Sequence, residues 1–141
     1  MVIIKPHIFL DNDAQKVSLI IGDILRRYLE RRLSVVAVNS FCMDRDAVAG
    51  FYQEHNGRPF FNDLINAMIA APSFFIVLEG EYAVQKVRSI NGATNPLEAA
   101  QGTLRRDYGR MEKGPNNAVH GSDSVESAER EIACFFPELA R

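Results

Sequence analysis

The chain has 141 residues, of which 47% are hydrophobic and 24% charged, and its formal net charge is −2. This composition is typical of one soluble globular domain over residues 1–141, and it excludes a disordered or fibrous chain. The slight negative charge excludes a global positive field that would attract nucleic acid or a membrane surface. A polyanion can therefore bind only where positive side chains gather locally.

The first elements alternate between strand and helix patterns. Val2–Lys5 predicts a short strand that ends at Pro6, because proline cannot donate to a strand ladder. Residues 7–16 are expected to form an irregular connection. From Val17 to Arg32 the apolar residues recur on one helical face, which predicts an amphipathic helix. The β-branched run Leu33–Met43 then predicts a second strand.

The middle of the chain contains the clearest helical period. Asp44 can cap a short helix that runs through Tyr52. Apolar residues of 61–69 repeat at helical spacing, and Pro72 ends that helix. The run "FFIVLE" (74–79) is uninterruptedly apolar before its glutamate, so it predicts a central strand buried on both faces.

The last third adds two more predicted helices and a strand. Residues 81–90 predict a helix that stops at Gly92, and the long loop-like stretch 93–117 is of the kind that usually carries function. A short strand ending near His120 and a helix over about 125–136 follow. The order β-α-β-(α-α)-β-α-β-α predicts a ferredoxin-like α+β fold, an antiparallel βαββαβ sheet covered by helices.

Cys42 lies in an apolar strand-like run and Cys134 beside Phe135 in a helical run, which predicts two buried free thiols. The chain shows no charged-then-apolar leader at its start, and its apolar runs are too short to cross a bilayer. We therefore expect a cytoplasmic protein. The histidines and cysteines lack the close spacing of a structural zinc site, and no glycine-rich phosphate loop occurs.

His120 is the first candidate for chemistry. It follows a predicted strand and precedes a helix capped by Asp123 or Ser124, where free backbone amides favour phosphate-like groups. Glu131 lies on the margin of the apolar stripe of that helix and can reach the imidazole to fix its tautomer. Spacing alone leaves two interpretations open: an oriented nucleophile, or a structural histidine beside a solvated glutamate.

Positive and aromatic side chains give further candidates. Lys5 ends a strand, Arg88 borders the buried face of its helix, and Arg105 lies in the long loop. Each could be ordinary surface charge, or they could bind a phosphate chain together with Thr94 and Asn117.

Phe60 is turned about 100 degrees from Phe61 around the helix axis, so the core does not require it. It could stack on a base or pack beneath the neighbouring loop, and the pattern leaves both possibilities open.

Six segments in order, covering nearly the whole chain, resemble the nucleoside diphosphate kinases. They are "IKP" (4–6), "FYQEHNGRPFF" (51–61), "VLEGEYAV" (77–84), "GATNP" (92–96), "GTLRRDYG" (102–109) and "NAVHGSDSVESAERE" (117–131). "NAVHGSDS" is among the most specific signatures of that family. The resemblance implies a kinase of nucleotide metabolism that moves the γ-phosphoryl group of ATP or another nucleoside triphosphate to a nucleoside diphosphate. It also implies ping-pong kinetics through a phosphohistidine.

The resemblance assigns roles to ten residues. It implies that His120 is the phosphorylated histidine, that Glu131 orients it, and that Tyr52 and Ser122 are polar neighbours. The phosphate and ribose ligands would be Lys5, Arg88, Thr94, Arg105 and Asn117, and Phe60 would stack on the base. The implied cofactor is Mg²⁺, held mainly by the nucleotide phosphates and not by dedicated protein ligands.

The resemblance further implies a cytoplasmic homo-oligomer, a hexamer by family analogy although tetramers and dimers occur, with no membrane and no specific nucleic acid as partner. The chain departs from the family at His7, where an acidic residue is usual, and at Arg106, where a small one is. The connection over 6–17 is several residues longer than usual, and the stretch between Arg105 and Asn117 is longer by about two.

Two other functions stay open at this stage. One is a nucleotide-binding protein of the same fold without turnover, suggested by the altered loop. The other is nucleic-acid binding through Arg26, Arg27, Arg31 and Arg32, against which the negative net charge argues.

Overall fold

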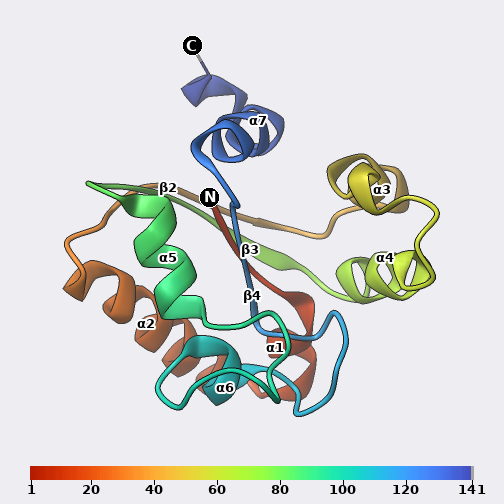
Figure 1. Ribbon diagram of the computed structural model, residues 1–141, viewed down its shortest axis with the longest axis horizontal. Coiled ribbons are helices and arrows are strands. Elements are labelled where there is room, and N and C mark those ends of the chain that lie inside the picture. The colour runs from red at the N-terminus through yellow and green to blue at the C-terminus, as the bar shows by residue number, and fades with distance from the viewer. Residues whose placement is uncertain (141) are drawn as a thin grey trace.

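Four antiparallel strands form the sheet of the computed structural model, which describes residues 1–140 (Figure 1). They are β1 (Val2–Ile4), β2 (Ser34–Phe41), β3 (Ser73–Glu79) and β4 (Val119–Gly121), in the order β2-β3-β1-β4. β1 pairs antiparallel with both β3 and β4, and β2 pairs antiparallel with β3. This strand order, joined by helical connections, confirms the predicted ferredoxin-like α+β fold.

Helices cover both faces of the sheet. They are α1 (Pro6–Asp11), α2 (Ala14–Glu30), α3 (Arg45–Phe51), α4 (Phe61–Ile69), α5 (Ala83–Asn91), α6 (Leu104–Tyr108) and α7 (Val125–Phe135), with short 3-10 turns at Gln53–His55 and Pro137–Leu139. Alternate residues of β1 point to opposite faces. Val2 and Ile4 pack with α2 and α5, whereas Ile3 packs with α3 and α4. Figure 1 accordingly shows α2, α5 and α6 grouped apart from α3 and α4.

Within residues 1–140, no helix combines the length and the apolar character needed to cross a membrane.

Several predicted boundaries are confirmed. β3 covers the predicted strand 74–79, and its middle residues are buried. Asp44 caps α3, where its carboxylate accepts the Ala47 N–H at 2.8 Å. α5 ends just before Gly92, whose φ of +86° lies in the left-handed region that glycine adopts without strain.

The prediction of an irregular connection over residues 7–16 is wrong, because these residues form most of α1 and the start of α2. Pro6 is the first residue of α1. Proline suits this position because its φ is already helical and because an N–H there would have no partner within the helix. Asp13 then caps α2 by accepting the Lys16 N–H at 2.8 Å. Proline is a sequence signal both for the end of a strand and for the start of a helix. At Pro6 only the packing decides between these two structures.

The prediction of a loop over residues 93–117 is wrong in part, because α6 lies within it. Thr103 caps this helix by accepting the Arg106 N–H at 3.4 Å. α6 has only 5 residues, too few to show a helical period in the sequence. It nevertheless positions Arg105.

The prediction of buried thiols is also wrong, since Cys42 and Cys134 are both exposed. Cys42 follows β2, which lies at the edge of the sheet and has a partner strand on one side only. Val125, the apolar first residue of α7, is 60% exposed. Apolar runs therefore overestimate burial at the sheet edge and on a helix that is covered on one side.

Candidate active site

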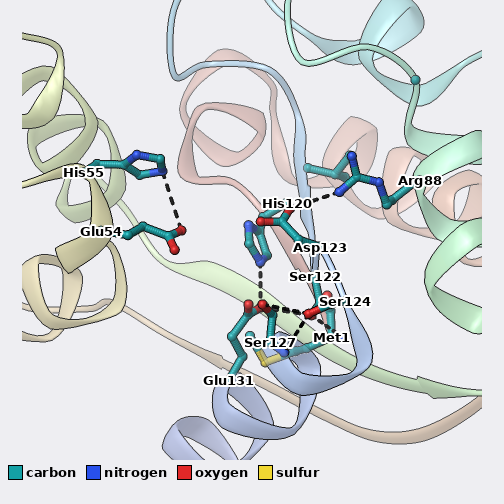
Figure 2. Close-up of polar contacts among 12 residues, drawn as sticks. Met1, Glu54, His55, Arg88, His120, Ser122, Asp123, Ser124, Ser127 and Glu131 are labelled. Carbon is teal, nitrogen blue, oxygen red and sulfur yellow. Dashed lines mark hydrogen bonds and ion pairs between the residues drawn. The ribbon is translucent and has the colours of Figure 1, made fainter. Parts of the chain in front are cut away.

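His120 lies in the middle of β4, opposite Ile3 of β1, and its side chain is 18% exposed. Its Nε2 is 2.7 Å from Oε1 of Glu131, and the Ser122 hydroxyl donates to the same oxygen at 2.9 Å (Figure 2). Because an ionised carboxylate only accepts, Nε2 must carry the proton. The lone pair of the neutral ring is therefore on Nδ1, so Nδ1 is the nitrogen that is able to act as a nucleophile.

The local structure of α7 explains why Glu131 reaches the ring. Ser124, one of the two predicted caps, starts the helix by accepting the Ser127 N–H at 3.0 Å. Glu131 follows two turns later on the inner side of α7 and is only 7% exposed. The predicted approach of this carboxylate to His120 is thus present in the structure.

Burial dominates the electrostatics of the imidazole. The carboxylate of Glu131 favours the charged ring, but the desolvation of His120 outweighs it and the pKa lies below its ordinary value of 6.5. A pKa below 6.5 keeps the imidazole neutral at pH 7, as nucleophilic attack requires.

A row of rings extends from His120 towards α4. The Tyr52 ring lies 6.2 Å from the imidazole and the Phe51 ring 5.2 Å, both edge to face. Tyr52 stacks on His55 at 6.1 Å, and His55 lies 5.5 Å from Phe60. Phe60 is 45% exposed, so it packs only partly against its neighbours and presents ring surface to solvent. Figure 2 shows His55 and Glu54 on the side of the site opposite Arg88.

Two basic side chains, the buried Lys5 and the half-buried Arg105, lie beside the residues that lead into β4. The Lys5 ammonium donates to the Pro115 carbonyl at 3.0 Å, and burial together with the charge of Arg105 lowers the pKa of Lys5 to about 7. Arg105 donates to the carbonyls of Gly92 at 2.7 Å and Val119 at 2.9 Å. Arg105 therefore ties α6 to the residue that precedes His120.

The remaining predicted ligands of the phosphates and ribose are Arg88, Thr94 and Asn117. Arg88 and Asp123 are 3.0 Å apart and both exposed, so their ion pair adds little stability and leaves both groups accessible. Asn117 is buried and donates from Nδ2 to the carbonyl of the exposed Thr94 at 2.9 Å.

Four buried side-chain atoms have no hydrogen-bond partner among the described residues, and three of them belong to predicted site residues. These are Tyr52 Oη, Arg105 Nε and Asn117 Oδ1, and the fourth is Ser73 Oγ. Buried polar atoms in folded proteins are nearly always paired. Their concentration in the predicted site residues indicates a place built for a polar ligand.

Two contacts of the site were missed by the sequence reasoning. Phe51 packs against His120, a contact that the sequence does not predict although Phe51 stands beside Tyr52 in the segment 51–61. For Asp123 the sequence predicts only a possible helix cap, whereas its carboxylate pairs with Arg88. No periodic pattern marks either contact, because both join segments distant in the chain.

Residues 1–140 match the family model described as nucleoside diphosphate kinase. The chain belongs to the nucleoside diphosphate kinase family. It therefore transfers the γ-phosphoryl group of a nucleoside triphosphate to a nucleoside diphosphate, which makes it a nucleotide-binding transferase of nucleotide metabolism.

Solved nucleoside diphosphate kinases share the fold over most of their length. The enzyme of Aquifex aeolicus is 34% identical, with a TM-score of 0.83 over 96% of this chain and 92% of that one. The apo enzyme of Encephalitozoon cuniculi is 30% identical, with a TM-score of 0.85 over 96% and 86%. The halophilic enzyme of Halobacterium salinarum, in complex with CDP, is 36% identical, with a TM-score of 0.84 over 96% and 84%.

Proposed function

We propose that this nucleoside diphosphate kinase works through a phosphohistidine at His120, by a ping-pong mechanism. The observation that carries the proposal is the 2.7 Å contact between His120 Nε2 and Glu131, which leaves Nδ1 with the lone pair. Nδ1 attacks the γ-phosphorus, the bond to the bridging oxygen breaks, and the nucleoside diphosphate leaves with the electron pair. A β-phosphate oxygen of the second diphosphate then attacks the phosphorus, the P–N bond breaks, and Nδ1 regains its lone pair.

The other site residues bind and neutralise the nucleotide in this proposal. Phosphoryl transfer depends mainly on positioning and on stabilising oxygen charge, which suits Lys5, Arg88 and Arg105. Tyr52 and Ser122 pack against the histidine and its carboxylate and hold them in place.

The sugar and base are assigned to uncharged groups. The unpartnered Oδ1 of Asn117 suits a ribose hydroxyl as donor, and Thr94 lies beside it. The exposed ring of Phe60 suits a stacked base, and stacking reads no base edge. We therefore expect ATP and other nucleoside di- and triphosphates as substrates, which agrees with CDP in the relative from Halobacterium salinarum.

Mg²⁺ is proposed as the cofactor and enters on the nucleotide. Residues 1–140 contain no group of three or more His, Cys, Asp or Glu that could hold a metal ion. Asp123 is an exposed carboxylate and would be available to the hydration shell of an ion that the nucleotide phosphates hold. The ion neutralises the phosphate oxygens when bound. Transfer is expected to stop in excess EDTA and return with added Mg²⁺, and undiminished transfer in EDTA would contradict this role.

The proposal also covers location, oligomeric state and domain organisation. We expect a cytoplasmic homo-oligomer, with a hexamer as the expected size and residues 1–141 as one domain. β2 lies at the sheet edge and exposes Val35, Val36 and Val38, which favours burial against a second copy. Light scattering after gel filtration measures the subunit number. A monomer at micromolar concentration would refute the oligomer.

The role of His120 is tested by incubation with γ-labelled ATP. The expected product is an acid-labile, alkali-stable phosphoprotein that passes its label to GDP. His120→Ala should abolish the label, whereas the control His55→Ala, which removes a half-buried histidine near the site, should keep it. Label that survives His120→Ala, or nucleotide binding without any label, would refute the phosphohistidine.

A further inference from the structure

His7, the second residue of α1, is 2% exposed and makes one short contact across the chain. Its Nε2 accepts the backbone N–H of Ala118 at 2.8 Å. A backbone N–H can only donate, so Nε2 must carry a lone pair and the neutral ring carries its proton on Nδ1. That nitrogen lies 3.5 Å from the carboxylate of Asp11, which favours the same tautomer.

The residue that His7 contacts is conformationally strained. Ala118 has a φ of +72°, in the left-handed region, which is energetically unfavourable for a residue with a Cβ. Ala118 is also fully buried. It stands between Asn117 and β4, two residues before His120. A residue in this conformation keeps it only when its surroundings determine it.

The segment 5–7 holds the strained residue from both sides. The Lys5 N–H donates to the Ala118 carbonyl at 2.9 Å, and His7 accepts from the Ala118 N–H. Both polar groups of this left-handed residue are thus paired with the same short stretch at the start of α1. The Val119 N–H also donates to the Asn117 carbonyl at 2.9 Å, so the turn that leads from Asn117 into β4 has this bond within it and two bonds to segment 5–7.

We propose that His7 is a positioning residue for phosphoryl transfer: its neutral imidazole, by accepting the Ala118 N–H, holds the left-handed turn that aims His120. The inference rests on the proposed role of His120. His7 itself touches neither the nucleotide nor the transferred group.

The surroundings keep the imidazole in the accepting form. Three charged groups face it: Asp11 on its own helix, Arg110 from the segment after α6, and Lys5 just before α1. Arg110 binds both oxygens of Asp11, at 2.9 and 2.8 Å, and its backbone N–H donates to the Asn116 carbonyl at 2.9 Å. Burial lowers the pKa of His7 to about 4, so Nε2 stays unprotonated near neutral pH.

Two substitutions separate the acceptor from the bulk of the side chain. His7→Gln places an amide oxygen near the position of Nε2, and His7→Phe keeps the shape of the ring without an acceptor. We expect His7→Phe to lower kcat by ~10- to 100-fold, with a smaller change in KM, because misplacing a reacting group by about 1 Å costs this much. His7→Gln should keep kcat within about threefold of its value in the unsubstituted protein, a much smaller change than the loss expected for His7→Phe.

A structural role alone would give another result. If His7 only fills the core, activity should follow thermal stability in both variants, and the flexible polar glutamine should be the worse one. Equal kcat in the two variants, or unchanged kcat in His7→Phe, overturns the proposal. ¹⁵N NMR of the imidazole in the unsubstituted protein gives a test independent of folding of the variants: the Nδ1–H tautomer supports the inference, and Nε2–H overturns it.

Labelling with γ-labelled ATP distinguishes this inference from the proposed function. The His7→Phe variant should reach full label slowly, whereas His120→Ala should take none. No label on the unsubstituted protein would refute the phosphohistidine itself. Label at the unsubstituted rate in His7→Phe would refute only the role of His7.

Discussion

Replacing Glu131 by glutamine tests the central contact of the site. The variant keeps the shape of the side chain and removes its charge, so the 2.7 Å bond to His120 becomes a neutral hydrogen bond. Bonds to charged groups contribute about 1.5–3 kcal/mol and neutral ones about 1 kcal/mol. The difference of roughly 0.5–2 kcal/mol corresponds to a rate loss of about 2- to 30-fold if the bond is stronger in the transition state.

The negative charge of Glu131 explains why the rate of phosphorylation should fall in the variant. Glu131 raises the pKa of His120 against the effect of burial, so its removal lowers that pKa further and makes Nδ1 a weaker nucleophile. Single-turnover phosphorylation of the protein by saturating ATP measures this step without product release. Glu129→Gln, an exposed glutamate of the same helix, is the matched control.

The expected outcome is a slower phosphorylation in Glu131→Gln and an unchanged rate in Glu129→Gln. An unchanged or faster rate in Glu131→Gln would refute the argument that the carboxylate orients and activates the ring. A phosphoryl group found on Nε2 would refute the assignment of the lone pair to Nδ1.

Three further predictions follow from single residues. The pKa of His7 is about 4 when folded and about 6.5 when unfolded, so acid favours the unfolded chain, and its free energy of unfolding should fall by about 2.5 kcal/mol between pH 7 and 4.5. In urea titrations of His7→Gln, this pH-dependent fall in the free energy of unfolding should be absent. An equal fall in the variant and in the unsubstituted protein would contradict the prediction. Tyr82 precedes α5 with a φ of +53° and is 73% exposed, so Tyr82→Asn should raise the free energy of unfolding by about 1 kcal/mol, measured in the same titrations. A lower value would show that the tyrosine ring makes a stabilising contact. Lys5 has a pKa of about 7 and loses its charge above it, so the KM for ATP should rise by up to about tenfold per pH unit between pH 7 and 9. A flat KM over that range would show that Lys5 does not bind phosphate.

Local patterns were sufficient for much of the fold. The period of α4, the apolar run of β3 and the caps at Asp44 and Ser124 depend on residues close in sequence, and all four are present in the structure. They failed where a residue has two local meanings, as at Pro6, or where a helix is too short to show a period, as in α6.

Within the site, the sequence by itself determined which residues to consider: the segment around His120, the carboxylate two helical turns into α7, and the separated cations and Phe60. Only the tertiary structure decided which nitrogen of His120 carries the proton, because that depends on a contact across 11 residues. It also decided the burial of Lys5 and the bond from Ala118 to His7, which spans 111 residues. Sequence patterns carry periodicity and residue chemistry, whereas tautomer, pKa and backbone strain depend on neighbours that the fold brings from elsewhere in the chain.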